Sequence, residues 1–250
     1  MKTATHYEGP ALDLFDSHAH LADSRYEEEG SLPSDVLCRA FKAGVTRVLI
    51  PSDSIASSLK AVKYVRENDK KYGVELFCSV GIHPHEASTW SSEVESELRN
   101  LLDNRIENKI CAIGEIGLDY YYDLSPRDIQ KDVYRKQLEL ALEYDIPFIL
   151  HERDASGDSI EILREFYKSN RLRNIPGVCH CCSCSPEIAA ELIKMGFYLG
   201  FDGPITFKNN KNSPQVIENT PSDRLVIETD SPYLTPDPFR GQRNNSTYLK

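Results

Sequence analysis

Eight short apolar runs, each bounded by turn residues and separated by helical patterns, place the strongest constraint on the fold of this 250-residue chain. Most of these runs do not alternate polar and apolar residues, which is typical of parallel strands that are covered on both faces. Strands are predicted at Leu12–Ser17, Val45–Pro51, Leu76–Ile82, Ile110–Glu115, Pro147–His151, Gly177–Cys181, Phe197–Phe201 and Leu225–Glu228.

Helix signals fill the intervals between the strands. One pattern opens at Pro33 and stops at Gly44, another runs from Ser185 to Gly196, and residues 125–144 carry an apolar stripe. This alternation favours an α/β fold of the TIM-like (β/α)8 barrel type, with an open doubly wound sheet as the alternative. No linker or repeat divides the chain, so we expect one domain over residues 1–250, with a flexible tail at 1–11. No helical pattern follows the eighth strand, so the last helix of the barrel is expected to be missing.

Composition excludes several classes of protein. The formal charge of −10 has the wrong sign for a protein that coats nucleic acid with a basic surface. No apolar run approaches the roughly 18 residues that a membrane span needs, and the first ten residues lack the apolar part of a secretory signal. Four of the seven cysteines lie between Cys179 and Cys184, which does not fit a secreted disulfide framework. We therefore expect a cytoplasmic protein with reduced thiols and no membrane contact.

Histidines and acids gather where the predicted strands end. His18 and His20 are two residues apart, a spacing that points both imidazoles to the same side of an extended chain. Other strands end near Glu115, His151, His180, Glu228 and Asp230. In a barrel these carboxyl ends meet at one mouth, and imidazole with carboxylate suits divalent metal ions. Two ions that share a carboxylate use four histidines and two acids, whereas a single tetrahedral ion does not.

The sequence resembles the TatD-related metal-dependent deoxyribonucleases from about Leu12 to Tyr248. A single H-x-H motif also occurs across the wider amidohydrolase group, whereas the full set of motifs in this order is specific to the family. The matching segments are FDSHAHL, GIHPHEA with His83 and His85, GEIGLDYYYD, IPFILHERDA, GPITFKN near Lys208, ETDSPYLTP, and PFRGQRN with Arg240 and Arg243.

This resemblance implies a ligand set and a reaction. His18, His20 and Asp230 would hold one metal, His151 and His180 a second, and Glu115 would bridge the two. A water between two cations loses its proton near neutral pH, and Asp230 can orient it or accept the proton. The implied cofactors are two divalent ions (Mg²⁺, Mn²⁺ or Zn²⁺), whose charge would attract DNA despite the acidic exterior. Phosphodiester hydrolysis is expected, with Glu115 and Asp230 as catalytic residues and a 3'–5' exonuclease action on single-stranded DNA or ends.

Four further residues are candidate substrate contacts, each with a simpler alternative. Arg153 lies two residues past His151 and can bind phosphate, or it can form a structural ion pair. His85 resembles the family's substrate-side histidine, although a polar loop role is the alternative. Tyr120, with the two tyrosines after it, can stack a base or simply cover the rim. Arg240 can contact the DNA backbone or remain solvated.

The sequence departs from the family at the sixth strand, where His180 is followed by Cys181, Cys182, Ser183 and Cys184. The family usually has an aromatic residue at 182 and a glycine at 184. Strand alternation predicts that Cys182 faces the site and favours a softer ion such as zinc, while a separate cysteine site and ordinary buried thiols are the alternatives.

Two other functions remain open beside the deoxyribonuclease. One is an amidohydrolase-type enzyme that acts on a small ester or C–N substrate, although many such enzymes carry a bridging lysine on the fourth strand, which this chain lacks. The other is a non-catalytic remnant that binds metal or a partner. Loss of the last helix should expose apolar surface on the eighth strand and lower stability, or lead to association.

Overall fold

The computed structural model describes residues 12–28 and 30–250, so the tail expected at residues 1–11 lies outside the described residues. All eight predicted strands are present. Their bounds are β1 Leu14–Asp16, β2 Val45–Ile50, β3 Glu75–Val80, β4 Ile110–Asp119, β5 Phe148–Arg153, β6 Gly177–Cys179, β7 Tyr198–Phe201 and β8 Leu225–Ile227.

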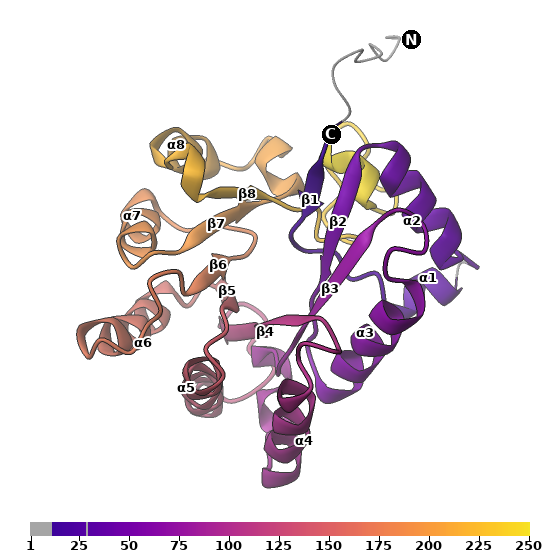
Figure 1. Ribbon diagram of the computed structural model, residues 1–250. Helices are drawn as coiled ribbons and strands as arrows, with labels where there is room; N and C mark the ends of the chain where they lie inside the picture. Colours follow the sequence, from indigo (N-terminus) through magenta and orange to yellow (C-terminus); the bar gives the residue numbers. More distant parts are fainter. Residues whose placement is uncertain (1–11, 29) are drawn as a thin grey trace.

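The strands form one parallel sheet in the order of the sequence, from β1 to β8. An open doubly wound sheet would reverse its strand order at a switch point, so this topology excludes that alternative. The sheet curls until β8 meets β1, where Ala19 pairs with Ser231 in an isolated parallel bridge. Figure 1 shows the strands around a common centre with the helices outside. The predicted (β/α)8 barrel is therefore confirmed.

Helices alternate with the strands and cover the outer face of the sheet (Figure 1). Proline occupies the first turn of α2 and α7, where its missing N–H costs no hydrogen bond, and these two predicted helices are confirmed. The α-helices are α1 Ser24–Glu28, α2 Pro33–Lys42, α3 Ile55–Asn68, α4 Ser92–Asp103, α5 Arg127–Glu143, α6 Ser156–Lys168, α7 Pro186–Lys194 and α8 Ser213–Asn219. Short 3-10 segments are η1 Pro84–Thr89, η2 Gly203–Thr206, η3 Ser222–Arg224 and η4 Ser246–Leu249.

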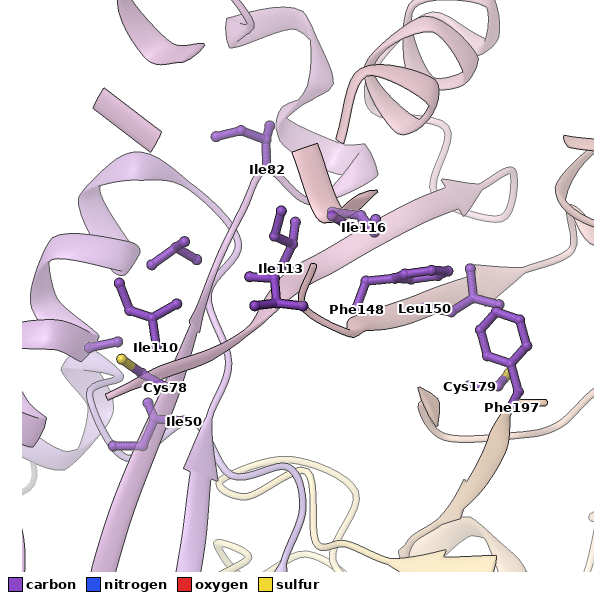
Figure 2. Packing of buried hydrophobic residues seen from close by; sticks show 14 of the residues in the cluster. Ile50, Cys78, Ile82, Ile110, Ile113, Ile116, Phe148, Leu150, Cys179 and Phe197 are labelled. Carbon is purple, nitrogen blue, oxygen red and sulfur yellow. The ribbon is translucent and has the colours of Figure 1, made fainter. Parts of the chain in front are cut away.

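Strand side chains supply much of the apolar core that holds the barrel together. Figure 2 shows Ile50, Cys78 and Ile113 from β2, β3 and β4, with Phe148 beside Phe197 at the other side of the view. The rings of these two phenylalanines meet edge to face, with centroids 5.4 Å apart. Both side chains are buried. Phe148 begins β5 and Phe197 directly precedes β7, so this contact fixes the amino ends of the two strands relative to each other.

Strand β4 continues four residues beyond its predicted end at Glu115. Its pairing with β5 shifts register between Ile113 and Ile116 and then runs on to Asp119, which pairs with Arg153. Just past the shift, Gly117 pairs with His151, and only glycine fits there, because its φ is +142° and an added Cβ would lie 1.9 Å from the carbonyl oxygen of His151. The extension places Asp119 at the mouth, next to the end of β5.

The segment after β8 contains no α-helix within the described residues, as the sequence predicts. Instead, η4 contacts β1, β2 and α2, and Figure 1 shows this yellow segment beside those strands. The three residues of β8 are only partly buried, and Phe15 of β1 is 36% exposed. Separately, no helix in the described ranges combines the length and apolar character needed to cross a membrane.

Candidate metal centre

Hydrogen bonds between the ends of β1 and β8 build one wall of the mouth. The buried Asp16 carboxylate accepts hydrogen bonds from the backbone N–H of Thr229, at 3.0 Å, and from its hydroxyl, at 2.7 Å. One residue further on, the N–H of Asp230 donates to the carbonyl of His18 at 2.9 Å. These bonds join segments more than 200 positions apart and hold His18, His20 and Asp230 at the same edge.

His18, His20 and Asp230 form a close group. The Nε2 atoms of the two imidazoles lie 3.2 Å apart, and Nε2 of His20 lies 3.2 Å from Oδ1 of Asp230. His18 is fully buried, whereas the side chains of His20 and Asp230 are 19% and 12% exposed. Burial opposes ionisation of Asp230, but the hydrogen bond from His20 together with the charges of His180, His20 and His18 outweighs it and lowers the pKa of this carboxyl.

Glu115 lies between two sets of histidines. Its Oε1 is 3.2 Å from Nε2 of His18 and 3.5 Å from Nε2 of His20. Its Oε2 is 3.6 Å from Nδ1 of His151 and 4.0 Å from Nε2 of His83. Burial raises the pKa of this carboxyl, yet His18 and His151 together hold it well below its usual range. Glu115 is therefore ionised, with one oxygen toward each set of donors.

His180 is oriented by stacking and by a buried carboxylate. Its ring stacks on that of His18, with centroids 3.6 Å apart, and its Nδ1 donates to Oε1 of Glu228 at 2.8 Å. This bond leaves Nε2 as the nitrogen available to a cation, as in many metal-bound histidines. Glu228 also accepts the backbone N–H of Cys181, so it is fixed from two sides. The sequence marked Glu228 only as a strand-end acid and did not reveal this orienting contact.

Whereas His180 is oriented through Nδ1, His151 is oriented through Nε2. That nitrogen lies 3.1 Å from Oδ2 of Asp119, so Nδ1 faces Glu115. The same Asp119 oxygen lies 2.9 Å from Nε2 of His85. Burial raises the pKa of Asp119, but the bonds from His151 and His85 outweigh it and lower this pKa strongly. Sequence reasoning missed Asp119, and its place in the GEIGLDYYYD segment was the only available signal.

His83 also reaches this group but differs in its tautomer. Its Nδ1 accepts the backbone N–H of His85 at 3.1 Å, so in the neutral ring the proton is on Nε2. Burial lowers the pKa of His83 well below its ordinary value, so the ring is neutral. In this tautomer His83 presents an N–H toward Glu115, although its ring also belongs to one of the donor groups that could hold a metal.

All six predicted ligands lie at this end of the barrel. Within the described ranges, three groups of residues could each hold a metal, because the donor atoms of each group lie within 4.8 Å of one another. They are His18 with Glu115 and His180, His18 with His20 and Asp230, and His83 with Glu115 and His151. His180 therefore groups with His18 and Glu115, whereas the sequence paired it with His151.

The candidate substrate contacts have different surroundings. Tyr120 donates its hydroxyl to Asp158 at 2.6 Å, and the guanidinium of Arg127 covers its ring, so Tyr120 is occupied by neighbours. Its ring is therefore not the freely exposed stacking surface that the sequence suggested. The guanidinium of Arg240 lies over the ring of Phe207, 3.7 Å from its centroid. His85 contacts Asp119, as described above.

The prediction that Cys182 faces the site is wrong. Strand β6 ends at Cys179, and Cys181 adopts a φ of +45°, which breaks the alternation. Cys182 consequently packs in the apolar core, with its Sγ 3.5 Å from that of Cys184. Among residues 12–28 and 30–250, none of the groups able to hold a metal includes a cysteine. This geometry favours the simplest alternative, ordinary buried thiols.

Known proteins match this chain over most of its length. A 40% identical protein of Bacillus subtilis, named uncharacterized metal-dependent hydrolase YabD, aligns over 95% of this chain and 87% of its own length. A 32% identical protein of Cronobacter sakazakii, named 3'-5' ssDNA/RNA exonuclease TatD, aligns over 94% of this chain and 86% of its own length.

Solved structures give the same result. The TatD homologue YJJV of Escherichia coli K12 superposes with a TM-score of 0.84 at 27% identity, covering 96% of this chain and 87% of the other. A family model described as TatD related DNase matches residues 15–250. The chain therefore belongs to the TatD-related DNase family.

Proposed function

We propose that this hydrolase cleaves phosphodiester bonds in single-stranded nucleic acid from the 3' end, with two divalent cations at the mouth of the barrel. The observation that carries the proposal is the position of Glu115. Its two carboxylate oxygens face different sets of donors, Oε1 toward His18 and His20 and Oε2 toward His151. A carboxylate in this position can bridge two cations, whereas a single ion would leave one set unused.

The donor set fits divalent metal ions. His18, His20 and Asp230 would hold one ion, His151 the second, and Glu115 both. The resemblance assigns His180 to the second ion, whereas in this structure it lies with His18 and Glu115, so either ion could take its Nε2. Imidazole nitrogens and carboxylate oxygens suit Zn²⁺ and Mn²⁺, and the acids also suit Mg²⁺. Asp119 and Glu228 hydrogen-bond the outward nitrogens of His151 and His180, a second layer of contacts that orients metal-binding histidines elsewhere.

The ions, when bound, would lower the pKa of a shared water and offset charge on the phosphate. The protein's own groups supply the remaining roles. Asp230 is ionised and partly exposed, so it can accept a proton from the attacking water. His83 presents Nε2–H and can donate a hydrogen bond to a phosphate oxygen.

The substrate class is supported by relatives and by charge. The name of the Cronobacter sakazakii relative describes an exonuclease that acts on single-stranded DNA and RNA from the 3' end. With a net charge of −10, the chain needs local positive charge to attract a polyanion. Two cations in the mouth, together with Arg153 at the end of β5 and Arg240 after β8, would supply that charge.

Cleavage of single-stranded DNA by metal-stripped protein resupplied with Mg²⁺, Mn²⁺ or Zn²⁺ tests the proposal. A label at the 5' end should yield a ladder of products that shortens from the 3' end. Glu115→Gln should abolish it, whereas Glu143→Gln, which changes an exposed acid paired with Arg99, should not. Metal binding without cleavage of DNA or RNA would instead favour a small-molecule hydrolase, and a folded protein that binds no metal would favour a non-catalytic remnant.

The cytoplasm is the proposed compartment. All seven cysteines are free, including the buried pair Cys182 and Cys184 whose Sγ atoms lie 3.5 Å apart. Thiols this close persist in a reducing environment. Mass spectrometry of protein purified from cells under alkylating conditions would show seven alkylated thiols.

A further inference from the structure

We propose that Tyr121, Tyr122 and Arg153, named here the rim platform, bind an unpaired nucleobase and its adjoining phosphate beside the metal centre. The inference rests on the proposed function and adds how the enzyme would recognise a single strand. It concerns two exposed aromatic rings and one cation, none of which is a metal ligand.

The two tyrosines are exposed in the segment that follows β4. Tyr121 is 57% exposed and Tyr122 is 53% exposed, and their rings meet edge to face with centroids 4.9 Å apart. Unlike Tyr120, neither hydroxyl has a hydrogen-bond partner among the described residues. Arg153 lies over both rings, as Arg127 lies over Tyr120, but more than half of each of these two side chains is still exposed and offers ring surface to a base.

Arg153 lies against both rings. Its guanidinium carbon is 4.0 Å from the centroid of Tyr121 and 4.8 Å from that of Tyr122. Within the described part of the chain no carboxylate pairs with Arg153, in contrast to Arg127, which pairs with Asp123 at 2.9 Å. The guanidinium is thus held in place by the rings while its N–H donors stay available to phosphate oxygens.

Asp119 ties the rim platform to the metal centre. Its Oδ1 accepts the backbone N–H groups of Tyr121, at 3.0 Å, and of Tyr122, at 2.8 Å. Its Oδ2 contacts His85 and His151, as described above. The ring of Tyr122 also meets that of His85 edge to face at 5.3 Å. One carboxylate therefore fixes the positions of the aromatic rings and of the site histidines together.

Stacking predicts a distinctive kind of selectivity. Every base has a π-face, so the rim platform should accept all four bases but should discriminate against a nucleotide that has no base. In duplex DNA the neighbouring bases already cover both faces, so the rim platform should favour unpaired ends. Arg153 contacts the backbone in this arrangement and should be indifferent to the presence of a base.

The test compares a fluorescein-labelled oligothymidylate with an oligonucleotide of equal length made of abasic residues. Both oligonucleotides carry phosphorothioate linkages that slow cleavage, so fluorescence anisotropy with the full chain in Mn²⁺ measures binding. We expect the oligothymidylate to bind about 5- to 150-fold more tightly, the range for one stacked base. Tyr122→Ala should remove most of this preference, Tyr122→Phe should keep it, and Tyr167→Ala, an exposed tyrosine on α6, should not change it.

Arg153→Gln should weaken binding of both oligonucleotides equally and should lower the salt dependence by about one counterion. Equal binding of the two oligonucleotides by the wild type, or equal effects of Tyr122→Ala and Tyr167→Ala, would overturn the inference. Initial rates of DNA cleavage with Mn²⁺ distinguish failure of the rim platform from failure of the proposed function. Cleavage that is indifferent to Tyr122 leaves the nuclease standing without the rim platform, and base-dependent binding without cleavage leaves the rim platform standing without the nuclease.

Discussion

Oδ2 of Asp119 lies 3.1 Å from Nε2 of His151, and this contact turns the opposite nitrogen of the ring toward Glu115. The carboxylate is completely buried, and its other oxygen accepts two backbone N–H groups from the segment that follows β4. Asp119 is therefore rigidly placed, and its position decides which nitrogen of His151 can bind a cation.

The first prediction follows from this contact. Asp119→Asn keeps the size of the side chain but presents an amide in place of the carboxylate, so His151 loses its fixed orientation. We expect the affinity for Mn²⁺ to fall by about 10- to 100-fold, in line with other orienting contacts. Isothermal titration calorimetry measures this affinity directly. Asp123→Asn is the matched control, because this exposed neighbour pairs with Arg127 and should leave Mn²⁺ binding unchanged.

The second prediction concerns Gly117, which pairs with His151 just past the register shift. An added Cβ at Gly117 would lie 1.9 Å from the carbonyl oxygen of His151, and its φ of +142° is strained for any side chain. Gly117→Ala should therefore displace β5 at His151 and lower both stability and Mn²⁺ affinity. Gly157→Ala in α6 meets no atom within 4 Å, so it should be neutral or slightly stabilising in thermal unfolding. Equal effects of the two variants would contradict the argument.

Sequence reasoning located the barrel because its signals are local. Short apolar runs and the prolines that open α2 and α7 act within a few residues, and the structure has these elements where they were predicted. The sequence-based prediction failed where a contact between distant segments overrides the local periodicity. Strand β4 continues to Asp119 because it pairs with β5 beyond the register shift, and no local pattern carries that pairing.

The remaining errors in the site have a similar cause. The alternation rule assigned Cys182 to the mouth, but β6 ends at Cys179, two residues before its predicted end, and Cys181 has a positive φ. Three tyrosines in succession look equivalent in the sequence. Only the contact of Tyr120 with Asp158 shows that this ring is occupied while the next two are exposed.

The third prediction concerns the buried acid Asp202. Burial raises the pKa of this carboxyl well above 3.8, and its Oδ2 has no hydrogen-bond partner among the described residues. The folded state therefore keeps the proton that the unfolded chain loses above this value, so the contribution of Asp202 to the free energy of unfolding should fall as the pH rises above about 4. Asp202→Asn should remove that dependence and stabilise the metal-free protein by about 1–3 kcal/mol at pH 8, with no gain at pH 3.

Chemical denaturation in EDTA across this pH range measures the difference for Asp202. Asp223→Asn, an exposed acid in η3, serves as its control. A gain for Asp202→Asn that is the same at pH 3 and pH 8 would show that the amide stabilises by packing and not by removing a titrating group.

The fourth prediction concerns the metals themselves. Ions that bind the folded centre and not the unfolded chain stabilise it, by about 2.7 kcal/mol when their concentration is one hundred times the dissociation constant. The melting temperature should therefore rise with added Mn²⁺ and fall in EDTA. Glu115→Gln removes the carboxylate whose two oxygens face both sets of histidines, so it should abolish most of this rise. Glu143→Gln should retain it, because that acid lies on the outer surface and pairs with Arg99.

Titration with Mn²⁺ also counts the ions. Two sites are expected in the wild type, and a single site that survives in Glu115→Gln would refute the bridging role of this residue.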